Sequence, residues 1–280
     1  MREPASVAGE GVDSLIRSIR DAGTADCVFR LPANVNMTIA INMTSEEYWR
    51  MFHLVRGDVE TAIGCSGTYL TINRLAAGNY DILQQYNRNA DFWRATTYAL
   101  QTGVFMALGR MFDQTKNTYT IEDVSEQTIE HPGFFTKAEL RQRKRESLNL
   151  FGNAPDPEWL PGFVANVVEP NRASLAILKT ELQPHVDKFI AVYEPIRHRY
   201  FAHRGKDSEQ AIKELFEKTA IVEVAEILRF SYGLITGIQE MAYNGTLPGK
   251  WTSDKSYDSL FKEYEKSTEE LVKGLKKNGA

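Results

Sequence analysis

Apolar residues recur at the spacing of an α-helix along most of the chain after residue 44. The clearest run advances in steps of four, three, four and three residues, through Tyr48, Phe52, Val55, Val59 and Ala62. Such steps place apolar side chains on one face of a helix, whereas a strand would alternate them at every second residue. Thr44 or Ser45 suits the N-cap of this helix. Because no convincing run of strands appears elsewhere, the sequence predicts an all-α protein.

Interruptions of the pattern divide the chain into further helices. We expect the first helix to stop at residues 64–67, where glycines cluster. Other helices are predicted at about residues 69–86, 89–111, 171–203, 208–244 and 254–275, with a short helical piece at 121–125. Pro184 and Pro195 should kink or break the long helix that contains them. The predicted fold is an antiparallel helical bundle with extra helices over residues 44–280, preceded by an irregular N-terminal arm at residues 1–43.

Composition and charge exclude several classes of protein. The 280 residues are 42% hydrophobic and 25% charged, as in a soluble globular protein. The apolar runs are too short to span a membrane, and no secretory signal follows Met1. Two cysteines cannot form a disulfide framework, so we expect a cytoplasmic protein. The net charge of −4 argues against binding nucleic acid over a broad surface, although it allows a local basic site.

Common catalytic motifs are absent from the sequence. There is no glycine-rich phosphate loop, and no H-E-x-x-H, C-x-x-C or G-x-S-x-G motif. The five histidines and two cysteines do not fall at the spacing of metal ligands. We therefore expect neither a metal nor another cofactor.

One short segment concentrates positive charge in this acidic protein. Glu194 and Asp207 enclose a stretch without carboxylates. It contains three arginines, two histidines and one lysine: Arg197, His198, Arg199, His203, Arg204 and Lys206. Arginine binds phosphate through two parallel hydrogen bonds, and histidine transfers protons near neutral pH. Cleavage of RNA without a metal needs these groups, because a base activates the 2′-hydroxyl and cations stabilise the charge that develops at phosphorus.

The basic segment, IRHRYFAHRGKD at residues 196–207, resembles the signature of the HEPN superfamily of nucleotide-binding domains. More narrowly, it resembles the HEPN-like domain of AbiU-type abortive-infection proteins. A second segment, ALGRMFDQ, is similar to an Arg-hydrophobic-Phe-Asp piece of that family, through Arg110 and Asp113. The similarity extends loosely from about Tyr48 to Tyr243.

The resemblance implies a HEPN-like bundle that forms a homodimer, in which two such motifs face each other in one composite ribonuclease site. Arg197 would bind and polarise the scissile phosphate, and His198 would orient the partner groups. His203 would be the general acid or base, or would hold the 2′-hydroxyl. The groups expected to bind RNA are Arg199, Arg204 and Lys206.

Such a protein would be a toxin or antiphage effector that cuts cellular RNA without a metal, and an antitoxin protein is a further expected partner. Some HEPN proteins are not nucleases. The alternative function is therefore a catalytically inactive HEPN-like module that binds a nucleotide or a protein. A plain helical scaffold with a coincidental motif is a third interpretation.

The basic segment also has structural interpretations. Glu194 could pair with Arg197 or His198 one helical turn away. Arg197 and His203 are six residues apart, so they share a face only if the helix is irregular, for example near Pro195. Elsewhere, Arg110 and Asp113 could form an ion pair within their own helix. The basic residues 137–145 fit either a solvated helix face or a contact with RNA.

Overall fold

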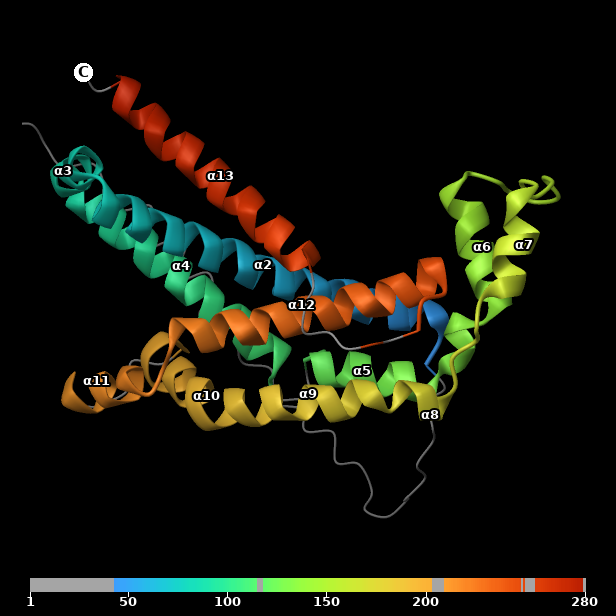
Figure 1. Ribbon diagram of the computed structural model, residues 1–280. Helices are drawn as coiled ribbons and strands as arrows, with labels where there is room; N and C mark the ends of the chain where they lie inside the picture. The colour runs from blue at the N-terminus through green and yellow to red at the C-terminus, as the bar shows by residue number, and fades with distance from the viewer. Residues whose placement is uncertain (1–42, 115–117, 203–208, 248, 250–254, 279–280) are drawn as a thin grey trace, which may run out of the picture. The chain divides into compact units, whose positions relative to one another are not determined.

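The computed structural model describes residues 43–114, 118–202, 209–247, 249 and 255–278, which are mostly helical and include no strand (Figure 1). The all-α fold class is therefore confirmed. The arm predicted at residues 1–43 lies outside the described residues, apart from Met43. No helix in these ranges combines the length and the apolar character that crossing a bilayer requires.

Helix α2 (Ser45–Gly78) begins where the sequence predicts. The Thr44 hydroxyl accepts a hydrogen bond from the Glu47 N–H at 3.2 Å, and the Glu47 carboxylate accepts one from the Thr44 N–H at 2.8 Å. This capping box satisfies donors that the first turn of a helix leaves without intrahelical partners. The predicted apolar face of α2 is buried in the main core.

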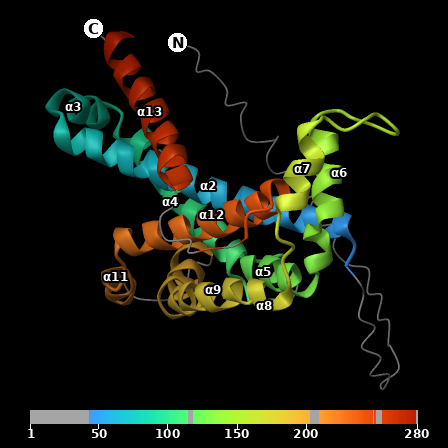
Figure 2. The same ribbon diagram turned by 45° about the vertical axis from the view of Figure 1, so that its right-hand side comes forward.

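The predicted stop at residues 64–67 is wrong, because α2 passes through it without a break. The glycines instead permit a close crossing with α13 (Lys255–Asn278), which lies beside α2 in Figures 1 and 2. A Cβ atom added to Gly64 would lie 2.8 Å from the ring of Tyr264. One added to Gly67 would lie 3.3 Å from Tyr264 Cβ. The absence of side chains here lets α13 approach closely.

Helices α3 (Tyr80–Arg88) and α4 (Ala90–Met111) follow, so the helix predicted at 69–86 is divided between α2 and α3. Asn79 marks the division, since its side chain accepts a hydrogen bond from the Ile82 N–H at 3.2 Å and caps α3. α4 packs extensively against α2 (Figure 1). A second, small core joins α2, α3 and α13 and contains Ile72, Ile82, Tyr86 and Val272.

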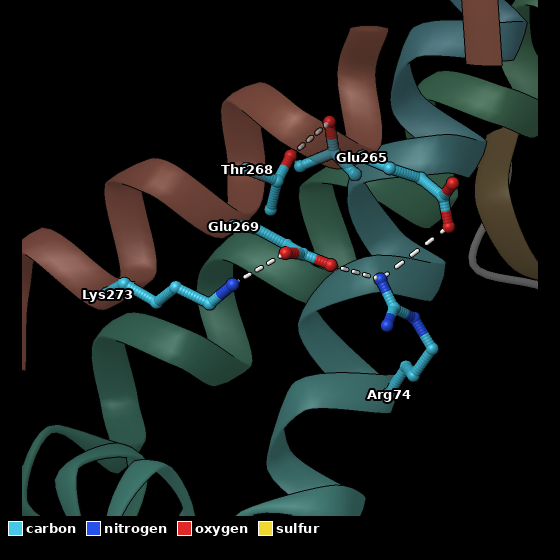
Figure 3. Close-up of polar contacts among 6 residues, drawn as sticks. Arg74, Glu265, Thr268, Glu269 and Lys273 are labelled. Carbon is cyan, nitrogen blue, oxygen red and sulfur yellow. Dashed lines mark hydrogen bonds and ion pairs between the residues drawn. The ribbon is translucent and has the colours of Figure 1, made fainter. Parts of the chain in front are cut away.

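Polar contacts also connect α13 to α2 (Figure 3). Arg74 Nη2 lies 2.7 Å from Glu269 Oε1 and 3.6 Å from Glu265 Oε1, and Lys273 Nζ lies 2.7 Å from Glu269 Oε2. The Arg74 side chain is 55% exposed. Exposed pairs of this kind contribute little to stability, because water and salt screen them. Buried residues such as Tyr257 therefore provide most of the attachment of α13, and the ion pairs help to fix its register.

The middle of the chain forms α5 (Ile121–Glu130), the 3₁₀ turn η1 (Pro132–Phe135), α6 (Lys137–Ser147) and α7 (Trp159–Asn166). A second capping box, made by Thr120 and Asp123, begins α5, which extends beyond the predicted piece at 121–125. α6 and α7 lie side by side in both views (Figures 1 and 2).

The long helix predicted at 171–203 is present as far as Ala202, with irregular turns. It consists of α8 (Arg172–Leu175), α9 (Ile177–Lys188), the π-helical turn η2 (Phe189–Tyr193), α10 (Glu194–Ile196) and a second π-helical turn, η3 (Arg197–Ala202). Pro184 lies inside α9 without ending it, whereas Pro195 lies between the two π-helical turns. Proline lacks an N–H and its ring meets the carbonyl four residues earlier, so wider turns accommodate Pro195.

Two helices, α11 (Glu209–Glu217) and α12 (Ile221–Asn244), replace the single helix predicted at 208–244. Ala220 separates them with an extended backbone, at φ −124° and ψ 132°. α12 ends at Gly245, whose φ of +67° is a left-handed conformation that glycine adopts without strain. α12 crosses α2 and contributes fully buried residues to the main core.

Candidate functional site

η3 places a basic side chain against the end of α4. Arg197 Nη2 lies 3.7 Å from Asp113 Oδ2, and the two side chains are only 13% and 14% exposed. A Cβ atom added to Gly109 would lie 2.2 Å from Arg197 Nε and 2.4 Å from Arg197 Cδ. Gly109 therefore leaves the space on α4 that the guanidinium group occupies. The segments ALGRMFDQ and IRHRYFAHRGKD, far apart in the sequence, meet at this contact.

Sequence reasoning missed Gly109. A glycine inside a helix lowers helix stability by roughly 1 kcal/mol relative to alanine. Where a helix contains one, close packing with a neighbouring group is the usual reason. The position of Gly109 within the regular helical pattern was the available signal.

The predicted ion pair between Arg110 and Asp113 is wrong. Arg110 instead donates to Asp58 of α2, from Nε at 2.8 Å and from Nη2 at 2.6 Å. α4 ends before Asp113, so the two residues do not share a helical turn. Asp113 is thereby available to pair with Arg197.

The anchoring of Arg197 leaves part of its hydrogen-bonding capacity unused. Its Nε atom is buried and makes no hydrogen bond with the residues that the structure describes. Buried nitrogen donors are satisfied in most proteins. Packing against Gly109 and the ion pair with Asp113 thus hold the guanidinium group, and its Nε atom is enclosed against α4.

His198 and Arg199 lie on the exposed side of η3. His198 Nε2 is 3.5 Å from Glu194 Oε1, so the structural pairing proposed for Glu194 exists. The His198 side chain is still 48% exposed, and this contact leaves it accessible to a ligand. Arg199 has no ion-pair partner within the described ranges.

The other three predicted site residues, His203, Arg204 and Lys206, lie outside the described residues. Arg197 and His203 can share a helix face only if the helix is irregular. η3 provides such an irregularity, because it is π-helical as far as Ala202. Hydrogen bonds in a π-helix run from residue i to i+5, so each turn takes more residues than an α-helical turn.

Comparison with known families decides the relationship of this chain. A family model described as AbiU2, of the HEPN type, matches residues 36–240. The chain belongs to the AbiU2 family of HEPN proteins. No curated protein and no solved structure matches it. In this AbiU2 protein the matched region contains η3 and the end of α4, whereas α13 follows that region.

Aromatic rings hold η3 of the AbiU2 domain in place. Phe201 stacks on Phe105 of α4 with ring centroids 4.5 Å apart. Tyr200 meets Phe216 of α11 edge to face at 5.1 Å. Each such pair contributes about 0.5–1.5 kcal/mol beyond its buried area. The basic residues of η3 are therefore carried on a turn that is packed on two sides.

Tyr193 joins η2 to α12 through its hydroxyl group. Its hydroxyl donates to Glu223 Oε2 at 3.1 Å, and burial raises the pKa of Tyr193 well above its usual value. Lys188 bonds the same carboxylate at 2.6 Å and lowers the pKa of Glu223. Tyr193 thus stays protonated and Glu223 stays charged near neutral pH.

The basic helix α6 of the AbiU2 domain makes internal contacts. Arg141 and Arg145 both donate to the carboxylate of Asp156, the first at 2.5 Å. Arg143 is 9% exposed and donates from Nε to the carbonyl of Ala242 at 2.9 Å. These arginines connect α6 to the loop before α7 and to the end of α12. These contacts give Arg143 and Arg145 a structural role, while Arg141 is still 55% exposed.

Asp156 makes this connection sensitive to acid. Hydrogen bonds from Arg141 and Arg145 hold the pKa of the Asp156 carboxyl below its usual value. Such a group stabilises the fold above its unfolded-state pKa of about 3.9, and the contribution is lost as pH falls through the lower folded-state pKa. We expect Asp156→Asn to lower the melting temperature at about pH 7, and the difference from wild type to shrink below about pH 4. Melting curves across this range test the expectation, and a difference independent of pH contradicts it.

In the part of the chain that the structure describes, no three His, Cys, Asp or Glu side chains gather closely enough to hold a metal ion. The candidate site of the AbiU2 protein is the basic turn η3 with its support on α4.

Proposed function

We propose that this protein is a metal-independent endoribonuclease, with a composite site formed by two copies of the η3 segment in a homodimer. Membership of the AbiU2 HEPN family supports the proposal. The observation that carries it is the π-helical turn η3, which holds Arg197 against α4 and exposes His198 and Arg199 beside it. π-helical turns are rare and are frequent at functional sites.

The proposed reaction divides its steps among these basic residues. His203 takes the proton of the 2′-hydroxyl, and the freed oxygen forms a bond to the adjacent phosphorus. The bond from phosphorus to the 5′-oxygen breaks, and the same histidine of the second copy returns a proton to that oxygen. Arg197 stabilises the charge on the phosphoryl oxygens, and His198 orients the reacting groups. Neighbouring phosphates bind to Arg199, Arg204 and Lys206.

The ion pair of Arg197 favours a second candidate function. An arginine that is 13% exposed and faces a carboxylate also suits a structural link between α4 and η3. In that case the protein is an inactive HEPN module that binds a nucleotide or a partner protein. The roles of toxin or antiphage effector, with an antitoxin as partner, belong to the first proposal.

Cleavage of single-stranded RNA in EDTA tests the first proposal. Wild-type protein should leave cyclic-phosphate or 3′-phosphate ends. His203→Ala and Arg197→Lys should each lower the cleavage rate at least about 100-fold, because one removes the proton-transfer group and the other removes the forked donor. Arg197→Lys keeps a positive charge opposite Asp113, so its melting temperature should stay near that of wild type.

Arg110→Lys is the matched control, because it makes the same chemical change on α4 at a residue that pairs with Asp58. It should keep the wild-type rate. Cleavage that survives both site variants would refute the site, and a strict monomer in light scattering at every concentration would refute the composite mechanism. Binding of RNA or a nucleotide without cleavage would support the second candidate.

A further inference from the structure

A cavity of about 170 Å³ lies between α2, α4 and the start of α12. Four aromatic residues line it: Tyr69 of α2, Phe105 of α4, Tyr193 of η2 and Phe216 of α11. Aliphatic side chains, including Val104 and Val224, complete its apolar surface. None of the described residues that line it carries a charge, so the cavity suits a neutral ligand.

The size of the cavity limits the ligand to one ring. Apolar cavities of about 150 Å³ bind benzene. Drug-sized ligands need roughly 300–1,000 Å³. A space of about 170 Å³ therefore accepts a six-membered ring with small substituents. Ala220 and Ile221, which also line the cavity, are exposed, so a ligand can enter from solvent.

Polar groups from α2 and α4 also line the cavity. Gln101 Nε2 donates to the Tyr69 hydroxyl at 2.9 Å. The carbonyl oxygen of Gln101 and the hydroxyl of Ser66 make no hydrogen bond within the described part of the chain. The cavity thus offers an unused acceptor together with hydroxyl donors. A ring that carries N–H and C=O groups side by side would satisfy both.

We propose that this cavity binds a neutral, single-ring heteroaromatic base of the pyrimidine class. Uracil has the required size, lacks charge and carries alternating N–H and C=O groups on its ring. Two sources supply this chemistry, a free base or nucleoside and one unpaired nucleotide of an RNA strand. Binding of a free base is independent of the ribonuclease proposal, whereas binding of a nucleotide within RNA rests on it.

Occupation of the cavity should stabilise η3. Phe105 stacks on Phe201, and Phe216 packs against Tyr200, so two rings that line the cavity also hold the turn that carries Arg197. A ligand in the cavity would make van der Waals contacts with Phe105 and Phe216 that these rings lack without it. We therefore expect η3 to become more ordered when a base binds in the cavity.

Titration of the full-length protein with uracil and adenine, followed by ligand-observed NMR and thermal melting, tests the proposal. Uracil should bind and raise the melting temperature, and adenine, a fused double ring, should bind at least about tenfold more weakly. Val224→Phe fills the cavity and should weaken uracil binding at least about tenfold. Val222→Phe, on the same helix but 64% exposed and outside the cavity, should bind as wild type does.

Gln101→Leu removes the acceptor and should weaken uracil binding about 3- to 10-fold, which provides a second variant if Val224→Phe does not fold. Cleavage-resistant 2′-O-methyl oligonucleotides separate the two sources. Tighter binding of oligo-U than of oligo-A, lost in Val224→Phe, identifies an RNA strand, whereas binding of uracil alone identifies a free base. If neither uracil nor oligo-U binds, or if both phenylalanine variants bind uracil equally well, the proposal is wrong. Neither titration measures cleavage, so its failure is distinct from failure of the ribonuclease proposal.

Discussion

Replacing Gly109 by alanine should destabilise the protein by about 2–4 kcal/mol, although alanine is the better helix former. The new Cβ atom would lie 2.2 Å from Arg197 Nε, so the guanidinium group must leave its place against α4. Asp113, which is only 14% exposed, then loses its ion pair with Arg197. Breaking a buried ion pair costs roughly 3–5 kcal/mol. Replacing a helical glycine by alanine stabilises the helix by only about 1 kcal/mol, so the net effect of the variant is destabilising.

Gly57→Ala is the matched control for this variant. Gly57 also lies inside a helix, α2, but a Cβ atom added there meets nothing within 4 Å. The change should therefore stabilise the protein by about 0.5–1 kcal/mol. Urea unfolding followed by circular dichroism measures both free energies. Wild-type stability in Gly109→Ala would show that Arg197 does not pack against Gly109 in solution.

Removing either partner of the Arg197–Asp113 pair should cost about 3 kcal/mol or more, and removing both should cost much less than the sum. Arg197→Met keeps much of the aliphatic side chain without its charge, and Asp113→Asn keeps the shape of the carboxylate. Each single variant removes one side of the contact between two poorly exposed charges, whereas the double variant removes both charges together. We expect a coupling free energy of about 1–3 kcal/mol from the unfolding free energies of the four proteins.

The pair Arg229–Asp258 is a reference for this cycle. Its N–O distance is shorter, 3.0 Å, but its side chains are 39% and 54% exposed. Solvent screening should limit its coupling to at most about 1 kcal/mol. A coupling near zero for Arg197 and Asp113 would show that Asp113 does not hold Arg197, and would weaken the structural interpretation of that arginine.

Most helices could be predicted because apolar spacing and capping residues are local signals. Thr44 indicated the start of α2 and Gly245 follows the end of α12 in the expected manner. Gly64 misled the prediction, because a glycine that ends a helix and one that admits a neighbouring helix look alike until Tyr264 is placed. The break between α11 and α12 contains no proline or glycine to indicate it.

The candidate site could be predicted in its chemistry but not in its contacts. The stretch without carboxylates between Glu194 and Asp207 indicated a basic site from composition alone. Asp113 belongs to a segment far earlier in the chain, so only the packing of η3 on α4 shows that it meets the basic turn. The end of α4 likewise prevents Arg110 from reaching Asp113, and sequence spacing does not reveal so small a change in helix length.

The boundary of the matched family region and the boundary of the folded unit do not coincide. The match ends at residue 240, inside α12, whereas α13 beyond it buries Tyr257 and Val272 and covers Gly64. An expression fragment cut at the end of the match would uncover a strip of α2 shaped to receive a helix, and uncovered apolar strips promote aggregation. A fragment designed for purification should therefore extend to the end of α13, at Asn278.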